Sequence, residues 1–511
     1  MRIIRSSVRP STISMTARSR ARRSQSYASD ESGYQMSHSK GPLFTVEEVL
    51  EITGGHRLSG AERRARAPGI RRLCTDSREV RAGDLFLALQ GERFDGHAFV
   101  PDALRRHAVG AVVRSQFRFP GAESRRGPAP LLIGVGDPLT AFQQLASHHR
   151  SRFGIPVVAV TGSNGKTTTK DMVAAVLAER WRVLKTEGNL NNRIGVPITL
   201  LHLTPRHEAA VIEMGVDAKG QTARLCEITR PTVGIITNIG PDHLEFFGTL
   251  DASADAKGEL LDHLPDDGTA VLNADDAFFT YLASRARCRV ISFGFSMTAQ
   301  VRGEPIAEAG GRGAGLRLWL PGQSHPSVAH LQIQGRHNLA NALAAAAVGY
   351  VLGMSGETIA RGLARFRPAD MRSQVVQRRG VTIINDCYNA NPASMKAALD
   401  LLKEVGNGHR TVAVLGDMLE LGPAAAELHR EVGAHAAARG LACLVACGDL
   451  GQGIAQGARA AGLPAAQVRE AHDSAEAAAV VKSMVRAGDV VLVKGSRGMK
   501  MERVVEALVK R

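Results

Sequence analysis

The chain contains no long hydrophobic run and few aromatic residues. Apolar residues make up 44% of its 511 residues, yet no stretch approaches the roughly 20 consecutive apolar residues that a membrane-spanning helix requires. Aromatic side chains account for only 4%, which leaves few rings on which nucleic-acid bases stack. The six cysteines form no Cys-x-x-Cys pair, so free thiols in a reducing cytoplasm are favoured over a disulfide or metal framework.

Positive charge is unevenly distributed along the chain. The net charge is +15, and residues 1–40 hold eight Lys and Arg against two Asp and Glu. The remaining residues hold 56 against 47 without a dense cluster, and an anionic small substrate explains this excess as well as nucleic acid does. We predict a disordered basic tail at 1–40. A misassigned start, with Met36 as the initiator, and a transit peptide are the alternatives.

Length and patterning predict three α/β domains. A chain of 511 residues is too long for one hydrophobic core. Apolar runs that resemble strands alternate with helical patterns, which is typical of folds with parallel sheets. We predict a small α/β domain at 41–150, a central domain with a parallel sheet at 151–365, and a doubly wound, Rossmann-like domain at 366–511.

A glycine-rich turn, TGSNGKTTT, lies between an apolar strand and a helical pattern. Its glycines let the backbone wrap a phosphate, while Lys166 neutralises β and γ oxygens and the Thr167 hydroxyl holds magnesium. Common nucleotide-binding loops have a glycine where this chain has Val160, and the shorter loop indicates a particular branch of ATP users. The predicted ATP-binding loop comprises Gly162, Ser163, Asn164, Gly165, Lys166, Thr167 and Thr168.

Two further polar residues close apolar runs in the central domain. Glu213 ends the run AAVIE, and His243 follows a Gly-Pro-Asp turn after the next run. Ligands of parallel sheets gather at the carboxyl ends of strands, so Glu213 is predicted to face magnesium held by Thr167, because this hard cation prefers oxygen ligands. A helix cap or a solvated acid is the alternative for Glu213, and a structural role is the alternative for His243.

Amides and charged groups later in the chain suggest a cleft. Asn338 and Asn341 stand one helical turn apart on one face; they suit an adenine edge or equally a helix cap, and the pattern leaves both open. In the third domain, Arg372 and a set of strand-end residues are predicted to face a cleft rather than a core. That set comprises Asp386, Asp417, Lys494, Ser496 and Arg497.

The motifs in this order resemble those of the Mur ligase family of bacterial peptidoglycan synthesis. They are TGSNGKTT, EGNLNNRIGVP, EMG, GPDHL, AKGEL, GRHNLANALAA, DCYNANPASM, LGDMLELG and VKGSRGMKME. The resemblance runs from about Phe44 to Lys510. YNANP and LGDMLELG resemble the branch that adds D-alanyl-D-alanine, and the Asp-Asn-Pro-Arg motif usual in the branch that adds the third amino acid is absent. Two departures are Met371 before Arg372, where Gly is frequent, and Cys387, where a smaller residue is common.

The resemblance implies an ATP-dependent peptide ligase. It would join D-alanyl-D-alanine to UDP-N-acetylmuramoyl-tripeptide through an acyl phosphate, with ATP and Mg²⁺, and so serve cell-wall synthesis, cell shape and division. The alternatives are another Mur-type amide ligase, a non-catalytic relative that binds UDP-sugar or ATP, and a nucleic-acid-associated ATPase. We expect a cytoplasmic monomer with small-molecule substrates, no nucleic acid and no membrane span.

The resemblance also implies roles for individual residues. Lys257, which by itself resembles a solvated helical lysine, matches the family position that is carbamylated and so becomes a metal ligand. The catalytic set is then Lys166, His243, Lys257 and Arg372, and the metal set is Thr167, Glu213, His243 and Lys257. The nucleotide contacts also include Asn338, Asn341, Arg372 and Asp386. The UDP-substrate contacts are Ser77, Arg78, Asn189, Asn191 and Asn192, and the dipeptide candidates are Asn389, Asn391 and Ser394.

Overall fold

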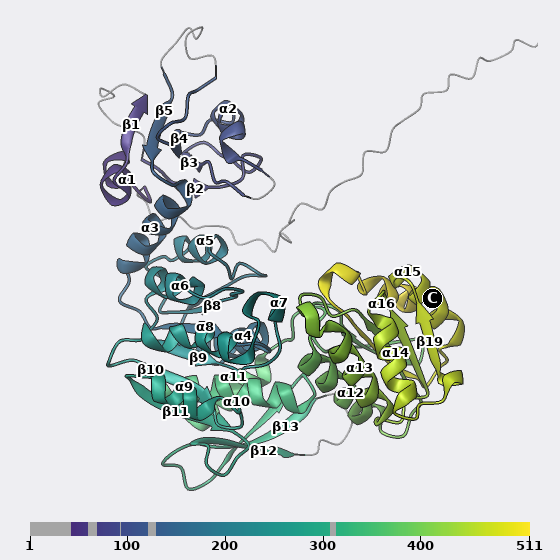
Figure 1. Cartoon of the computed structure of the whole chain (residues 1–511). Helices are drawn as coiled ribbons and strands as arrows, with labels where there is room; N and C mark the ends of the chain where they lie inside the picture. The colour runs from purple at the N-terminus through teal and green to yellow at the C-terminus, as the bar shows by residue number, and fades with distance from the viewer. Residues whose placement is uncertain (1–41, 60–68, 92–93, 121–128, 307–312, 511) are drawn as a thin grey trace, which may run out of the picture. The chain divides into compact units, whose positions relative to one another are not determined.

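The computed structural model describes residues 42–59, 69–91, 94–120, 129–306 and 313–510 (Figure 1). The predicted basic tail at 1–40 therefore lies outside the described residues. Within the described ranges, no helix is both long enough and apolar enough to cross a membrane. Three separate β-sheets organise the structure, and they lie within the three ranges predicted from the sequence.

The first sheet has five strands in the order β1-β5-β4-β3-β2, and only β1 runs antiparallel. Its strands are β1 (His56–Ser59), β2 (Arg72–Cys74), β3 (Asp84–Leu87), β4 (Gly110–Arg114) and β5 (Leu131–Val135). Helices α1 (Val46–Thr53) and α3 (Pro138–Ser151) pack on one face, and α2 (Val100–Arg105) packs on the other. Alternate residues of each strand supply the two apolar faces, as the period of two requires.

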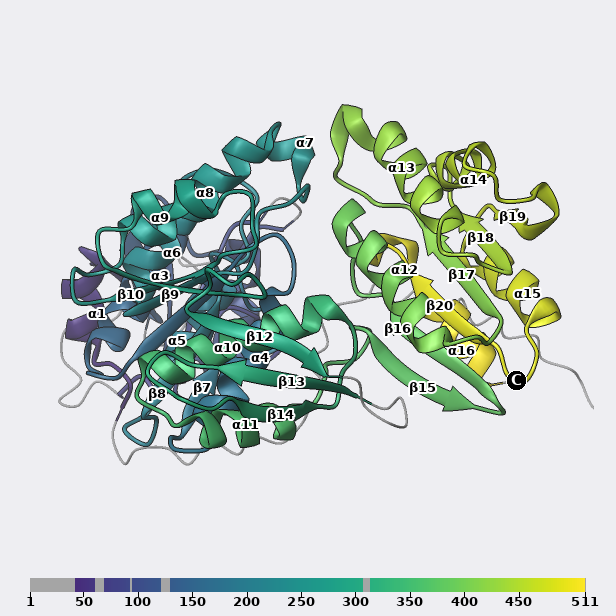
Figure 2. The same cartoon turned by 90° about the horizontal axis from the view of Figure 1, so that it is seen from below.

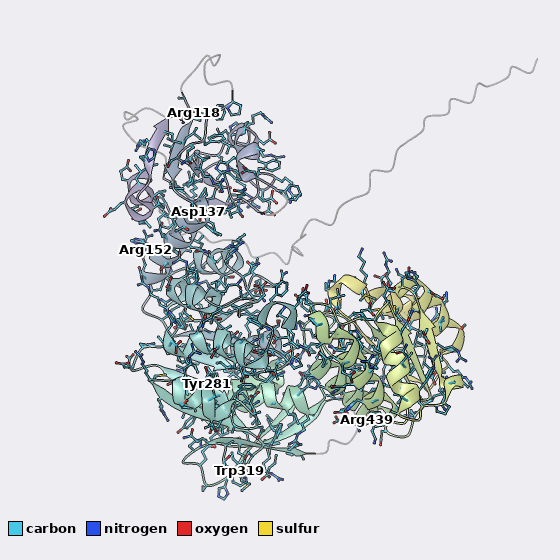
Figure 3. The ribbon with its side chains drawn as sticks, in the orientation of Figure 1. Arg118, Asp137, Arg152, Tyr281, Trp319 and Arg439 are labelled. Carbon is cyan, nitrogen blue, oxygen red and sulfur yellow. The ribbon has the colours of Figure 1, made fainter. Side chains whose placement is uncertain are left out.

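Helix α3 shows why a helix begins where the sequence predicts it. Asp137, labelled in Figure 3, accepts hydrogen bonds from the N–H groups of Leu139 (3.3 Å) and Thr140 (3.0 Å). Pro138 occupies the first helical position, where its missing N–H has no cost and its fixed φ suits the helix. The aspartate cap and the proline together fix the start of α3.

The central sheet has nine strands in the order β14-β13-β12-β11-β10-β9-β6-β8-β7. They are β6 (Val157–Thr161), β7 (Val183–Lys185), β8 (Ala209–Glu213), β9 (Val233–Ile236), β10 (Thr269–Asn273), β11 (Arg289–Gly294), β12 (Val301–Ile306), β13 (Ala314–Trp319) and β14 (Ser327–Leu331). β7 to β12 pair in parallel, whereas β12, β13 and β14 pair antiparallel. The prediction of a wholly parallel sheet is therefore wrong at this edge. The alternating burial of β14 is typical of a strand with one solvated face.

Helices cover both faces of the parallel part of this sheet (Figure 2). α4 (Lys166–Leu177), α10 (Arg336–Val351) and α11 (Gly356–Arg365) form one apolar layer. α5 (Gly195–Leu201), α6 (Gln221–Thr229), α8 (Leu250–Asp262) and α9 (Phe279–Arg285) contribute to the opposite layer. Residues of β6, β8 and β9 are buried throughout, which explains their continuous apolar runs. A short helix, α7 (Leu244–Phe247), follows His243.

The third sheet has six strands in the order β15-β16-β20-β17-β18-β19, with only β15 antiparallel. They are β15 (Gln374–Arg378), β16 (Val381–Asp386), β17 (Thr411–Gly416), β18 (Cys443–Cys447), β19 (Val468–Ala471) and β20 (Val490–Lys494). α12 (Pro392–Gly406), α13 (Ala425–Ala437) and α14 (Gly451–Ala460) cover one face, and α15 (Ser474–Met484) and α16 (Glu502–Val509) cover the other. The predicted doubly wound domain is confirmed, with an antiparallel edge strand added.

Candidate active site

The glycine-rich turn lies between β6 and α4, as predicted. Gly162 and Gly165 have φ values of +136° and +78°, which side chains other than glycine rarely adopt. A Cβ on Gly162 would lie 2.0 Å from the hydroxyl oxygen of Thr237, and one on Gly165 would lie 2.3 Å from the amide oxygen of Asn341. Both glycines are therefore required for the close packing of this turn.

Residues at the end of β9 hold the turn in place. The N–H of Asn164 donates to Oδ1 of Asn238 (3.0 Å), and the Asn238 amide donates back to the Asn164 carbonyl (3.0 Å). The Thr237 hydroxyl also donates to that carbonyl, at 2.6 Å. The sequence interpretation missed Thr237 and Asn238. Their position directly after an apolar run, in TNIGPD, was the available signal.

Lys166 bends back over its own turn. Its Nζ donates to the carbonyl oxygens of Gly162 (2.6 Å) and Ser163 (3.3 Å). Helix α4 begins after Gly165 without a side-chain cap, so its first N–H groups are available to an anion, as at other helix N-termini. A backbone cradle and a lysine held above it are suited to the phosphates of a nucleotide.

Glu213 lies beside Thr167 and is almost fully buried. Its Oε1 accepts hydrogen bonds from the Thr167 hydroxyl (3.0 Å) and from the side-chain amide of Asn191 (2.8 Å). Its Oε2 is buried without a partner among the described residues, and an orphaned carboxylate oxygen is costly. A hard cation at this oxygen would remove that cost, and the hydroxyl and carboxylate are the donor types that Mg²⁺ takes. The described residues contain no cluster of three or more His, Cys, Asp or Glu, so any magnesium here depends on few protein ligands.

Asp242 joins the turn to Lys257. Its Oδ1 accepts hydrogen bonds from the Ser163 hydroxyl (2.5 Å) and from Lys257 Nζ (3.0 Å), while its Oδ2 is buried without a partner among the described residues. Burial acts to raise the pKa of Asp242, but the positive charges of Lys257 and Lys166 outweigh it and lower the pKa. The sequence interpretation missed Asp242, because an aspartate after Gly-Pro indicates only a turn.

Lys257 is not the solvated lysine that its helical position alone suggests. Its side chain on α8 is 1% exposed, and its Nζ donates to the Ser253 hydroxyl at 2.6 Å and lies 4.8 Å from the centre of the Phe247 ring. Burial lowers its pKa to about 8, despite the opposing effect of Asp242. Its ammonium group therefore loses a proton at a pH well below that of a free lysine.

His243 occupies a strained position after Asp242. Its φ of +50° lies in the left-handed region, which is uncommon for a residue other than glycine. Its Nδ1 lies 2.6 Å from Oε2 of Glu420, a residue of the LGDMLELG motif that also has positive φ. In the described ranges, no hydrogen bond links His243 to Thr167 or Glu213. Its assignment as a metal ligand stays a prediction.

The two asparagines of α10 are buried and make internal hydrogen bonds. Asn338 donates to the Gln334 carbonyl at 2.7 Å, and Asn341 donates to Asn338 Oδ1 at 3.3 Å. The Asn341 oxygen accepts a hydrogen bond from Thr169 at 3.2 Å and lies against Gly165. Asn341 therefore supports the turn from beneath, and contact of either amide with a nucleotide stays a prediction.

Charged side chains gather at the carboxyl ends of β16 and β20. Asp386 accepts hydrogen bonds from the Ser373 N–H (2.8 Å) and from Lys494 Nζ (2.6 Å). The Arg372 guanidinium stacks 3.9 Å from the centre of the Tyr388 ring. Parallel pairing aligns Asp386 with Lys494, so the sequence correctly placed these strand-end residues at one edge. Cys387 is buried, and burial raises the pKa of its thiol, which argues against a nucleophilic role.

The dipeptide candidates have local structural roles. Asn391 caps α12 in a reciprocal capping box with Ser394, and its side-chain amide donates to Oδ1 of Asn164 at 2.8 Å. Asn389 accepts a hydrogen bond from the Ala390 N–H at 2.9 Å. These bonds account for the three side chains without a ligand, and their contact with a dipeptide stays a prediction.

The UDP-substrate candidates are divided between two regions. Ser77 is buried in the first domain, and Arg78 is exposed and forms an ion pair with Asp76. Asn192 accepts hydrogen bonds from the N–H groups of Ile194 and Gly195 at the start of α5, and Asn189 is exposed. Asn191 instead reaches Glu213, so one predicted substrate residue belongs to the predicted metal site.

Comparison with known proteins identifies the family. The model of the Mur ligase family catalytic domain matches residues 69–149, that of the Mur ligase middle domain matches 160–349, and that of the Mur ligase glutamate ligase domain matches 371–497. A UDP-N-acetylmuramoyl-tripeptide--D-alanyl-D-alanine ligase from Synechocystis is 39% identical over 441 residues, which are 86% of this chain and 92% of that protein.

Solved structures agree with this assignment. A MurF from Acinetobacter baumannii has a TM-score of 0.82 and 32% identity, covering 92% of this chain and 99% of its own. A MurF ligase from Thermotoga maritima in complex with ADP has a TM-score of 0.76 and 28% identity, covering 86% and 97%. With three family domains in order and the phosphate cradle intact, the chain belongs to the Mur ligase family.

Proposed function

We propose that this ATP-dependent ligase joins D-alanyl-D-alanine to UDP-N-acetylmuramoyl-tripeptide in peptidoglycan precursor synthesis. The observation that carries the proposal is the likeness, over nearly the whole chain, to relatives named for this reaction. The turn at Gly162–Lys166, held by Asn238 and backed by Asn341, supports the use of ATP. The same carboxylate edge supports ligation rather than simple nucleotide binding.

The chemistry needs an activated carboxyl group. A carboxylate oxygen of the tripeptide attacks the γ-phosphorus of ATP, so that an acyl phosphate forms and ADP leaves. The amine of D-alanyl-D-alanine then attacks the acyl carbon, the carbon–oxygen bond to phosphate breaks, and inorganic phosphate leaves as the amine loses a proton. Both steps bring anions together, so positioning and cationic stabilisation supply most of the catalysis.

The residues of the turn divide this work. The N–H groups at the start of α4 orient the phosphates, and Lys166 stabilises charge on the γ-phosphoryl group after leaving its carbonyl partners. Thr167 and the orphaned oxygen of Glu213 fit a magnesium ion, which when bound supplies charge neutralisation on the phosphates. Arg372 supplies a further cation from the third domain.

Lys257 fits a role as a carbamylated ligand. Its buried amine, with its pKa near 8, adds CO₂ more readily than an ordinary lysine because only the neutral amine is nucleophilic. Carbamylation would convert the cation beside Asp242 into an anion, and the orphaned Asp242 oxygen fits a cation between the two carboxylate groups. A second magnesium ion near His243 follows from this proposal.

The first experiment measures phosphate release with ATP, Mg²⁺ and the UDP-tripeptide, in the presence and absence of D-alanyl-D-alanine. We expect release that depends on both substrates, together with a product heavier by the dipeptide residue in mass spectrometry. Turnover with UDP-dipeptide and lysine or diaminopimelate instead would identify the branch that adds the third amino acid. Stimulation by DNA or RNA would support the nucleic-acid-associated ATPase, and binding without turnover would support a non-catalytic relative.

Lys166→Ala tests the turn directly. Loss of a group that stabilises transition-state charge costs about 10²-fold to 10³-fold in rate, so we expect kcat to fall by at least about 10²-fold. Lys403→Ala, on the exposed side of α12, removes the same charge as a control and should retain full activity. Full turnover by a folded Lys166→Ala variant would remove the lysine from the mechanism.

A further inference from the structure

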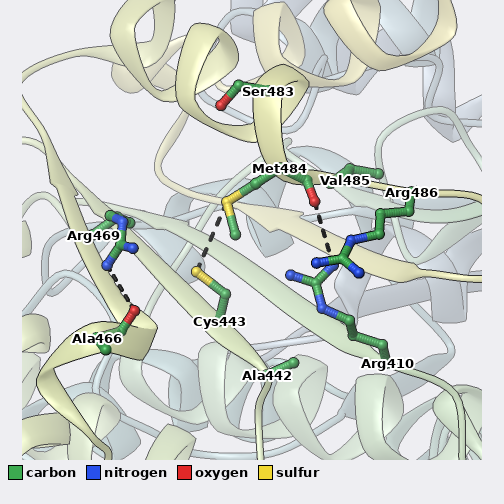
Figure 4. A pocket seen from close by; sticks show the side chains of 9 residues that line it. All are labelled: Arg410, Ala442, Cys443, Ala466, Arg469, Ser483, Met484, Val485 and Arg486. Carbon is green, nitrogen blue, oxygen red and sulfur yellow. Dashed lines mark hydrogen bonds between the residues drawn. The ribbon is translucent and has the colours of Figure 1, made fainter.

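A second polar cavity lies in the C-terminal domain, away from the residues described above. Its volume is about 480 Å³, which falls within the range of small-molecule sites. Three arginines line it, Arg410, Arg469 and Arg486, together with Cys443 and Met484. In Figure 4, Arg469 lies on one side of Cys443 and Met484, and Arg410 and Arg486 lie on the other.

The cavity is at the edge of the sheet opposite to Asp386 and Lys494. Arg410 directly precedes β17, Cys443 opens β18 and Arg469 is the second residue of β19, and these strands are parallel. The cavity therefore lies at their amino ends, whereas Asp386 and Lys494 end β16 and β20. A five-residue strand spans about 16 Å, so a ligand in the cavity does not contact the strand-end residues of the candidate active site.

Positive charge in the cavity exceeds the negative charge nearby. Asp489, which is 3% exposed, accepts hydrogen bonds from Arg410 Nη1 (2.5 Å) and from the Arg486 N–H (2.8 Å). It is one carboxylate against three guanidinium groups. Burial raises the pKa of the Cys443 thiol, while the charges of Arg469 and Arg410 act against this, so the field of both arginines reaches the cavity wall.

The arginines retain hydrogen-bond donors that the protein does not use. Arg410 employs Nη1, on Asp489 and the Met484 carbonyl, and Arg469 employs Nη1, on the carbonyls of Ala466 and Val468. Among the described residues, no protein acceptor binds their other guanidinium nitrogens or the guanidinium group of Arg486. Guanidinium groups bind phosphate oxygens in pairs through such free N–H groups.

We propose that this cavity binds a small phosphorylated compound through Arg410, Arg469 and Arg486. Its volume exceeds the needs of one phosphate group, and Cys443 and Met484 offer an apolar wall to the body of a phosphate ester. No aromatic side chain lines it, so a nucleobase has no ring on which to stack. The site is separate from the ATP turn, and its test does not depend on the reaction proposed above.

Calorimetric titration of the full chain tests the proposal, with inorganic phosphate and glucose 6-phosphate as separate probes. The Lys166→Ala background removes phosphate binding at the ATP turn. Arg486→Gln and Arg469→Gln remove exposed cavity charges and leave the Arg410–Asp489 pair intact. Arg459→Gln, on α14 and paired with Glu470, removes the same charge outside the cavity as a matched control, and the Tm of each variant verifies folding.

We expect saturable binding of at least one probe in the Lys166→Ala background. Arg486→Gln and Arg469→Gln should each raise its Kd about tenfold, and Arg459→Gln less than twofold. Tighter binding of the ester identifies an organic phosphate as the ligand, and tighter binding of inorganic phosphate identifies the free ion. Absence of saturable binding to either probe, or a Kd that is indifferent to Arg486 and Arg469, overturns the proposal.

Discussion

Single residues of the turn explain why its sequence tolerates so little change. Gly162 and Gly165 combine positive φ with neighbours that a Cβ would strike, so two separate costs apply at each position. Gly353, after α10, has a φ of +73° but nothing within 4 Å of an added Cβ. The chain therefore contains an internal control that separates backbone strain from steric conflict.

Gly165→Ala should weaken nucleotide binding at least tenfold, because Asn341 must move and the start of α4 moves with it. Gly353→Ala should lower the free energy of unfolding by about 1 kcal/mol, from left-handed strain alone, with no effect on nucleotide affinity. Titration with an ATP analogue and urea unfolding measure the two effects. Equal nucleotide affinities in the two variants would contradict the role given to this contact.

Lys257 gives a pH-dependent expectation. With its pKa at about 8, the neutral fraction of the amine falls about tenfold for each pH unit below 8. At fixed dissolved CO₂, carbamate at Lys257 should therefore increase from pH 6.5 to 8.5. Mass spectrometry after chemical trapping of the carbamate measures it, with Lys403 as the exposed control. Carbamate that is absent throughout, or that declines over this range, would count against the assignment.

Residue chemistry also marks where the sequence was sufficient and where it was not. Glycine, lysine and threonine after an apolar strand were enough to predict the turn, because all the needed contacts are local. Asp242 and Asn238 act through residues about 75 to 80 positions away, and no local pattern records such pairing. Burial of Lys257 is invisible for the same reason, and only the family resemblance drew attention to it.

At the scale of elements, α12 shows one residue with two candidate roles. Asn391 caps the helix through its oxygen and contacts Asn164 through its nitrogen. The strands β13 and β14 show the opposite situation, since apolar spacing predicted strands there but not their direction. Direction depends on which neighbour a strand pairs with, and the local sequence does not specify it.

Replacing Asn391 separates its two roles. Asn391→Ala should lower the free energy of unfolding by about 1 kcal/mol through the lost cap, whereas Asn391→Asp keeps the cap and loses only the contact with Asn164. Urea unfolding and the KM for D-alanyl-D-alanine measure the outcome. Asp473→Ala, which removes the cap of α15, should reduce stability similarly without changing that KM. If Asn391→Ala and Asn391→Asp leave the KM unchanged as well, Asn391 does not contact the dipeptide.

At the scale of the whole molecule, the positive net charge of +15 favours anionic substrates. The Debye length falls from about 10 Å at 0.1 M salt to about 3 Å at 1 M. The KM for the anionic UDP-tripeptide should therefore increase several-fold between 0.05 and 0.5 M NaCl. D-alanyl-D-alanine is a zwitterion and serves as the control, since its KM should change little. Equal salt dependence of the two KM values would show that net charge does not assist capture.

The position of β20 has a consequence for synthesis of the chain on the ribosome. β20 (Val490–Lys494) lies between β16 and β17 and pairs with both, so two strands made more than 70 residues earlier have no central neighbour until it emerges. The C-terminal sheet therefore cannot assemble progressively during translation. It closes in one late event, and a nascent chain halted before residue 490 would expose two unpaired strand edges to proteases and chaperones.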